Sequence, residues 1–519
     1  MSGRPNFVFF ITDQHRADWL GCYGHNVVRT PHIDALAQNG TRFDNFHVAS
    51  PVCMPNRASL ITGRYPSVHG LRYNGCTLPH SANTFVDVLA AAGYHTAAIG
   101  KSHLQPFLDP KPVCHSAEGI LIEEAWKRDD NDYLQEQPGR YLSDGRYEFA
   151  TPYYGYQHVD MVTNHGDRCG GHYQQWLRQK APDWQALQDD GNELPHNYSC
   201  PQAFRTPVPE ELYPTAYIRD RASDYLESRK GNDEPFFLFV SFPDPHHPFN
   251  PPGRYWDMYS PDEFDVPLPY EAHVNPPPPM RHLHQKWEHG GKQETPQTAM
   301  MLGPDQLREA MALTAGMISM VDDAVGDVVE SLRASGHYDN TVICFNSDHG
   351  DYLGDFNMIL KGALQFRSIT RVPFIWSDPM RQTVADTNVL ASSLDISASV
   401  LERAGLPPYG GMQGRSLLPC LEGGADLRED LVVEYNDGGI RLGFEAPARV
   451  RSLLTQRYRF TLYRDQPWGE LYDHENDPRE THNRWDDPAY ASVKAELSLR
   501  LNHQLTAMMD ESPKGRHMA

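Results

Sequence analysis

The chain has 519 residues, with 46 Lys and Arg against 68 Asp and Glu, so its formal net charge is −22. This length allows more than one domain and a large buried core. Hydrophobic residues make up 39% and charged residues 22%, values typical of a soluble globular protein. The acidic balance excludes a nonspecific binder of nucleic acid or of anionic membranes, because both need a basic surface. An anionic substrate would need a local positive site.

Cysteine usage and the N-terminal segment bear on the compartment. No two cysteines have CxxC spacing, and their density is far below that of a disulfide scaffold. The first residues lack the charged, apolar and cleavage regions of a secretory signal, and no apolar run approaches the roughly 18 residues of a membrane span. We therefore expect a reduced, cytoplasmic protein with free thiols and neither a membrane nor a nucleic-acid partner. The cysteines are Cys22, Cys53, Cys76, Cys114, Cys169, Cys200, Cys344 and Cys420.

Apolar runs alternate with helical patterns over the first part of the chain. A run that is apolar on both faces suits a buried strand of a parallel sheet. The alternation predicts an α/β sandwich with a large, mostly parallel central sheet. The expected strands are 7–11, 95–99, 236–242, 341–345 and 372–376, and the expected helices are 31–38, 84–92, 215–228, 305–334 and 396–404.

Two composition changes divide the chain further. The stretch 104–209 is rich in Gly, Pro, Asp and Tyr, which predicts an irregular insertion over one edge of the sheet, and 243–279 is a Pro-rich loop. After about residue 424, three short strands (430–435, 448–453 and 458–463) and a final helix (490–509) predict a smaller α+β unit with an antiparallel sheet. We expect a catalytic domain at 1–424 and a C-terminal subdomain at 425–519.

The segment Cys53-Met54-Pro55-Asn56-Arg57 is the sharpest local feature. Pro55 suits the first turn of a helix, so Cys53 would lie just before the helix N-terminus, where free N–H groups favour an anion. Arg57 would follow one turn later on the same side. The alternative is a buried structural cysteine with a surface arginine. The spacing is too short for the phosphate loop of a Cys-dependent phosphatase.

Polar residues that follow the expected strands form a second group. The carboxyl ends of parallel strands line the ligand crevice of an open α/β sheet, so these side chains can converge. Two carboxylates and an imidazole suit a divalent metal, although an Asp after a strand is often only a helix cap. Taken singly, the Lys and His residues could be surface or core residues, and the Asn a turn residue. The candidates are Asp13, Asn74, Lys101, His103, His246, Asp348, His349 and Lys361.

These motifs together resemble the type I sulfatases. The Cys53–Arg57 segment continues as Leu60-x-Thr62-Gly63-Arg64, and the block Thr30-Pro31-His32-Ile33-Asp34 precedes it. Further matching blocks are Gly100-Lys101-Ser102-His103, Pro245-His246-His247-Pro248-Phe249, Ser347-Asp348-His349-Gly350 and Glu470-Leu471-Tyr472-Asp473 with Asp477-Pro478-x-Glu480. The resemblance spans about residues 7–480 and is closest to the bacterial branch of arylsulfatases and phosphonate monoester hydrolases. It implies an alkaline-phosphatase-like α/β/α sandwich.

The resemblance implies a role for each candidate residue. Cys53 would be oxidised by a formylglycine-generating system, and the hydrated aldehyde would attack sulfur. Asp13, Cys53, Asp348 and His349 would bind one divalent metal. Arg57 would hold the diol, while Lys101, Lys361 and Asn74 would contact the transferred group. His103 would assist deprotonation of the diol, and His246 would protonate or stabilise the leaving group.

Two departures from the family pattern affect these expectations. Many sulfatases have a second Asp in place of Gln14 and an Asn in place of His349, which weakens the expectation of Ca²⁺ and makes Mn²⁺ or Zn²⁺ credible. Lys101 and His103 fit sulfatases, whereas phosphonate monoester hydrolases tend to have uncharged residues there. We therefore expect hydrolysis of small, mainly aryl, sulfate monoesters.

Three alternatives stay open. One is a phosphonate monoester or phosphate diester hydrolase on the same site, with cross-reactivity expected. Another is a non-catalytic anion-binding protein with an unmodified Cys53. A zinc-binding structural module would need clustered Cys and His ligands, which the scattered cysteines do not supply. The sequence allows a monomer or a homo-oligomer, and relatives in this branch suggest a dimer or tetramer.

Overall fold

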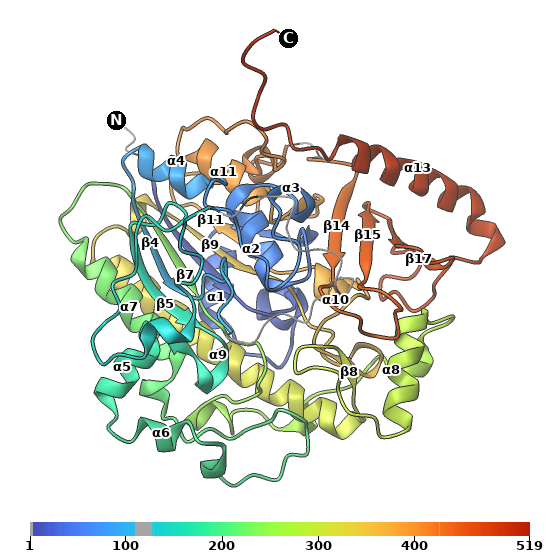
Figure 1. Cartoon of the computed structure of the whole chain (residues 1–519), viewed down its shortest axis with the longest axis horizontal. Coiled ribbons are helices and arrows are strands. Elements are labelled where there is room, and N and C mark those ends of the chain that lie inside the picture. Colours follow the sequence, from blue (N-terminus) through green and yellow to red (C-terminus); the bar gives the residue numbers. More distant parts are fainter. Residues whose placement is uncertain (1–3, 109–126, 128, 425, 519) are drawn as a thin grey trace.

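The computed structural model describes residues 4–108, 127, 129–424 and 426–518. Within this part, a nine-stranded sheet forms the centre of the molecule (Figure 1). Its middle strands run parallel to one another, and the strands that oppose them are β11 and β6. The spatial order is β12 (Asp386–Thr387), β2 (Thr41–Phe43), β11 (Phe374–Ser377), β9 (Thr341–Ser347), β1 (Asn6–Thr12), β7 (Phe236–Ser241), β4 (His95–Gly100), β5 (His158–Thr163) and β6 (Gly170–Gly171).

Helices cover both faces of this sheet, which explains why its central strands are apolar on both sides. Phe7, Phe9 and Ile11 of β1 pack on one face, whereas Val8 and Phe10 pack on the other. The first face is covered by α2 (Cys53–Thr62), α4 (Phe85–Ala91), α11 (Asp395–Arg403) and α12 (Leu418–Leu421). The second is covered by α1 (Pro31–Gln38), α5 (His172–Lys180), α7 (Pro214–Ser228) and the long α9 (Pro304–Ala334). The α/β/α sandwich is therefore confirmed.

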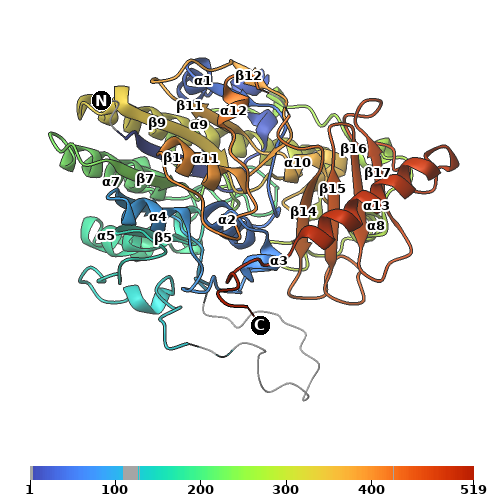
Figure 2. The same cartoon turned by 90° about the horizontal axis from the view of Figure 1, so that it is seen from above.

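A second, four-stranded antiparallel sheet follows near the C-terminus and lies beside the sandwich (Figure 2). Its strands are β14 (Leu431–Asn436), β15 (Arg449–Leu454), β16 (Tyr458–Tyr463) and β17 (Gly469–Asp473). One face packs on α13 (Ala491–Ala507) through Leu497 and Leu501, and the other packs toward α8 (Pro278–Glu288). The expected small α+β unit is therefore present, while the boundary at residue 424 stays a prediction. The other short elements are α3 (Pro66–His69), α6 (Trp184–Leu187), α10 (Arg367–Thr370), β3 (Phe46–His47), β8 (Met300–Met301), β10 (Met358–Ile359) and β13 (Ala391–Ser392).

The expectation of an irregular insertion at 104–209 is wrong in an important part. This stretch supplies β5, which pairs in parallel with β4, and α5, which packs on the sheet. Asp160 interrupts the apolar pattern of β5 and hides the strand from sequence analysis. Its buried carboxylate accepts hydrogen bonds from Arg146, His158 and the hydroxyl of Tyr217. These donors compensate the burial of a charged residue, so the strand forms although its sequence is not uniformly apolar.

A buried arginine connects the second sheet to the sandwich. Arg459 of β16 is fully buried and donates to Glu480 over 2.6 Å and to Glu470 over 3.1 Å. Glu480 also accepts the backbone N–H of Arg367 at the start of α10, over 2.8 Å. The strand β17 contains Glu470 and is absent from the predicted elements, because its five residues are few and two of them are acidic although all are buried.

We predict that Arg459→Met lowers the free energy of unfolding by about 3–5 kcal/mol, because it leaves two buried carboxylates without their cation. Chemical denaturation followed by circular dichroism measures this loss. Arg464→Met is the matched control, since Arg464 directly follows β16 and pairs with Asp465, and the two side chains are 44% and 86% exposed. The control should lose no more than about 1 kcal/mol. Equal losses in the two variants would contradict the argument.

Candidate active site

The five parallel strands in the middle of the sheet place polar side chains at a single edge. Asp13 follows β1, Lys101 follows β4, His165 follows β5, His246 follows β7, and Asp348 follows β9. Because the strands are parallel, these carboxyl ends meet at the same edge of the sheet. Residues that are far apart in the sequence therefore lie close together at this edge.

Helix α2 brings Cys53 to this edge. Cys53 is the first residue of α2 and is 1% exposed, and all ten residues of the helix are buried. The helix ends at Gly63, whose left-handed φ of 64° fits glycine and whose missing Cβ leaves room for Ser397. The expected helix is therefore present, and it begins at Cys53 itself, where the sequence predicted a start just after this residue. The Cys53 Sγ atom lies 3.1 Å from His349 Nε2 and 3.6 Å from Asp13 Oδ1.

The four residues expected to bind a metal lie together. One ligand atom from each of Asp13, Cys53, Asp348 and His349 lies within 4.8 Å of the others, and all four residues are buried. The His349 Nδ1–H donates to the carbonyl of Gly350 over 2.8 Å, so Nε2 faces the group. Two carboxylates, an imidazole and a sulfur, or an oxygen in its place, fit a divalent cation.

Positive side chains contact the two carboxylates of this group, Asp13 and Asp348. Lys101 forms an ion pair with Asp13, and Arg57 Nε donates to Asp348 Oδ2 over 2.7 Å. The Lys361 ammonium donates to Cys53 Sγ over 3.2 Å, and its Nζ lies 2.8 Å from His349 Nε2. Burial alone would raise the pKa of Asp13, but Lys101 and the other cations hold it well below its ordinary value.

The same charges set the protonation of the two residues at the centre. Burial and Asp13 raise the pKa of the Cys53 thiol, but Lys361 and His349 outweigh them and its pKa is lowered. Burial and Lys361 lower the pKa of His349, but Asp348, Cys53 and Asp13 raise it to about 10. A divalent cation bound by these residues would therefore compete with a proton on His349.

Three other expected residues also lie near the site, each with its own contacts. His246 donates from Nδ1 to the His247 carbonyl over 2.5 Å, so its Nε2 faces Lys361 at 3.2 Å. The Asn74 carbonyl oxygen accepts the N–H of Met54 over 3.2 Å at the start of α2. His103 stacks on a phenylalanine ring and has a buried, unpartnered Nδ1. Its contacts in the described part of the chain do not include Cys53.

Sequence reasoning missed two residues of the site. His165 Nε2 lies 2.6 Å from Lys101 Nζ, and its ring stacks on His246 with centroids 3.6 Å apart. It lies in the stretch that was expected to be irregular, so only recognition of β5 could have found it. Gln14 accepts from Lys361 over 3.1 Å and donates to Asp351 over 2.6 Å. It was noted only as a departure from the family pattern.

The neighbourhood of His165 contains a second group of ligand atoms. Asp13, His165 and His246 have such atoms within 4.8 Å of one another. The Lys101 ammonium contacts Asp13 and His165 directly, so a protein cation already neutralises this group.

An α/β/α sandwich with carboxylates, an imidazole and a cysteine gathered at its strand ends is the arrangement of an alkaline-phosphatase-like hydrolase. The sulfatase family model matches residues 5–406, and the model of the C-terminal region of N-sulphoglucosamine sulphohydrolase matches residues 357–507. The chain therefore belongs to the sulfatase family and is a sulfuric ester hydrolase.

Similar proteins agree with this family. An arylsulfatase of Clostridium perfringens is 27% identical over 92% of this chain and 90% of its own length. An ulvan-active sulfatase of Formosa agariphila is 28% identical over 98% of this chain and 82% of its own. The crystal structure of a phosphonate monoester hydrolase of Agrobacterium radiobacter has a TM-score of 0.76 and 25% identity, and it covers 98% of this chain and 97% of its own. None of the helices in the described residues is long and apolar enough to span a membrane.

We predict that Asp348→Asn weakens binding of the divalent metal by more than about 100-fold, because it removes a ligand charge. Metal content per chain, measured by plasma mass spectrometry after dialysis, reports the loss. Asp355→Asn is the control, because Asp355 forms an ion pair with Arg16 and lies outside the ligand group. Retention of the metal by Asp348→Asn would show that Asp348 is only a partner of Arg57.

We also predict that His165→Phe lowers kcat/KM for a sulfate ester by about 10-fold to 100-fold. The phenyl ring keeps the stacking on His246 but cannot accept the Lys101 hydrogen bond. His503→Phe is the control, since His503 is exposed on α13, outside the site. Steady-state kinetics and thermal unfolding of both variants separate a positioning role from packing. Unchanged kinetics in His165→Phe would leave His165 with a packing role alone.

Proposed function

We propose that the chain hydrolyses small, mainly aryl, sulfate monoesters with a formylglycine derived from Cys53. The observation that carries the proposal is the placement of Cys53, buried at a helix N-terminus, against Lys361, His349 and Asp13. An unmodified thiol here would only be a buried cysteine. When present, the hydrated aldehyde supplies a nucleophile that can regenerate, and the metal supplies a Lewis acid.

The cations of the site would bind the sulfate group. Lys361 is a buried ammonium group in contact with Cys53, and Lys101 is a second one against Asp13; burial strengthens their attraction for an anion. Arg57 uses Nε on Asp348 and one terminal nitrogen on the Lys101 carbonyl and Ser241. Its second terminal nitrogen has no hydrogen bond and lies 3.5 Å from Asp13. That nitrogen is the part of Arg57 available to a group on residue 53.

The histidines of the site would handle protons. Burial, His165 and His247 lower the pKa of His246, and burial and Lys101 lower that of His103. Both are therefore neutral and able to accept a proton. An anionic ester beside His246 would raise its pKa, which would let Nε2 carry a proton to the leaving oxygen.

One observation favours a second activity at the same site. The phosphonate monoester hydrolase named above shares the fold over nearly the whole chain. Sulfate and phosphonate groups are similar in size, so cross-reactivity is expected. We favour the sulfate ester because this chain has Lys101 and His103, two residues that fit the sulfatase pattern. Phosphonate monoester hydrolases tend to have uncharged residues at these two positions. Calcium, manganese or zinc, a maturation system, a homo-oligomeric state and a cytoplasmic location stay predictions.

The state of residue 53 tests the proposed nucleophile. We expect mass spectrometry of the peptide that contains Cys53 to show the aldehyde in protein made by a host that performs the modification. Cys53→Ala should lower the turnover of 4-nitrophenyl sulfate by at least about 1,000-fold. Cys344→Ala, a buried cysteine of β9 outside the site, is the control. An intact thiol would favour the anion-binding alternative.

The sulfate preference is tested by turnover of two esters under one metal condition. We expect a higher kcat/KM on 4-nitrophenyl sulfate than on the 4-nitrophenyl ester of phenylphosphonate. The two substrates share a leaving group, so the difference reports the transferred group alone. A much higher efficiency on the phosphonate would reverse the assignment.

A further inference from the structure

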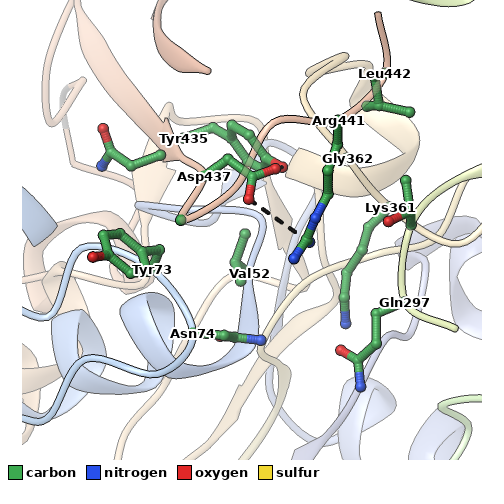
Figure 3. A pocket seen from close by; sticks show the side chains of 13 residues that line it. Val52, Tyr73, Asn74, Gln297, Lys361, Gly362, Tyr435, Asp437, Arg441 and Leu442 are labelled. Carbon is green, nitrogen blue, oxygen red and sulfur yellow. Dashed lines mark hydrogen bonds and ion pairs between the residues drawn. The ribbon is translucent and has the colours of Figure 1, made fainter. Parts of the chain in front are cut away.

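A cavity of about 150 Å³ adjoins the active site on the side of the C-terminal sheet (Figure 3). Lys361 and Asn74 line it, and Lys361 also contacts Cys53, so the cavity opens directly beside the reacting residue. Its opposite wall comes from β14 and the following loop, through Tyr435, Asp437 and Arg441. A volume of this order accommodates a ring of the size of benzene.

Two charged residues on this wall, Asp437 and Arg441, differ in how many contacts they make with the protein. The Asp437 carboxylate accepts from the Tyr435 hydroxyl over 3.0 Å and from the Gly439 N–H over 3.1 Å, and its side chain is 7% exposed. Within the described part of the chain, the Arg441 guanidinium has one ion-pair partner, Asp437 at 3.7 Å, and no hydrogen bond. Its side chain is 29% exposed and reaches into the cavity (Figure 3). Asp437 is thus occupied by the protein, whereas Arg441 still has donors to offer.

Positive charge also accumulates behind this wall. Arg449 donates to the backbone carbonyls of Asp437 and Ala448. These acceptors are neutral, so they do not compensate the positive charge of Arg449. Burial lowers the pKa of Arg449, and the neighbouring Arg464, Arg72 and Arg451 lower it further. With Lys361 on the near side, the cavity is flanked by cations at both ends. Its electrostatic potential therefore favours an anion over a cation.

We propose that this cavity binds the alcohol portion of the substrate, and that this portion has its own negative charge, a carboxylate or a second sulfate, held by Arg441. A planar guanidinium suits both groups, because each presents two oxygens to its paired N–H donors. Asp437 positions Arg441 by its ion pair and fixes the loop through Tyr435 and Gly439. The inference rests on the proposed sulfatase activity and adds the chemical class of the leaving group.

The test compares substrates and variants in one assay. The probes are 4-nitrophenyl sulfate, the same ester with a ring carboxylate, and choline sulfate, whose alcohol is cationic. For the wild type and for Arg441→Gln, we take the ratio of kcat/KM for the carboxylated ester to kcat/KM for the uncharged ester. Comparing the two ratios cancels the difference in leaving-group reactivity, because that difference is the same for both proteins. We expect the substitution to lower this ratio by about 10-fold to 100-fold, the range for a lost hydrogen bond between charged groups.

Further variants keep the test decisive. Arg441→Lys keeps the charge but loses the paired donors, so it should keep part of the preference. Arg333→Gln removes a similar charge from an exposed side chain near the end of α9, outside the cavity, and should leave the ratio unchanged. A ratio unaffected by Arg441→Gln, or a wild-type preference for choline sulfate, would overturn the inference. Absence of turnover on all the sulfates, with activity on a phosphonate, would instead overturn the proposed function.

Discussion

The buried carboxylate of Asp13 requires positive neighbours, and this requirement organises the site. Removing such a charge from water costs several kcal/mol unless opposite charges and hydrogen bonds compensate it. The compensation comes from Lys101 after β4, Arg57 from α2 and His349 after β9. Each partner comes from a distant part of the sequence, so the charges balance only when the parallel sheet and α2 have assembled. Fold and site are therefore parts of one arrangement.

The same balance reconciles an acidic protein with an anionic substrate. The net charge of −22 is spread over the whole chain, whereas Arg57, Lys101 and Lys361 lie buried around one cysteine. Ions screen the outer charges over about 8 Å at physiological salt, but they screen buried groups much less. The potential at the site is thus set by its own cations. In the proposed binding mode, Arg441 extends this local field toward the leaving portion of the substrate.

The sequence predicts the site better than the connections around it. Apolar runs reveal β1 and β9, and the residues that follow them include Asp13 and Asp348, because strand ends have a fixed place in a parallel sheet. His165 escapes prediction because Asp160 interrupts β5, and only Arg146, His158 and Tyr217 make that charge acceptable. Arg441 escapes for a related reason. Its loop lines the cavity with Lys361 and Asn74 only because the C-terminal sheet lies against the sandwich, and no local sequence pattern reports that contact.

The burial of Cys53 has a consequence for the order of events in the life of the protein. With 1% of its surface exposed, and every residue of α2 buried, this side chain is out of reach of another enzyme once the chain has folded. Any enzymatic conversion of Cys53 must therefore act on the nascent or unfolded chain. Maturation would then compete in time with folding. The fraction of active molecules would depend on how long the first 60 or so residues stay accessible, and slower synthesis or a lower temperature would change that fraction without any change in sequence.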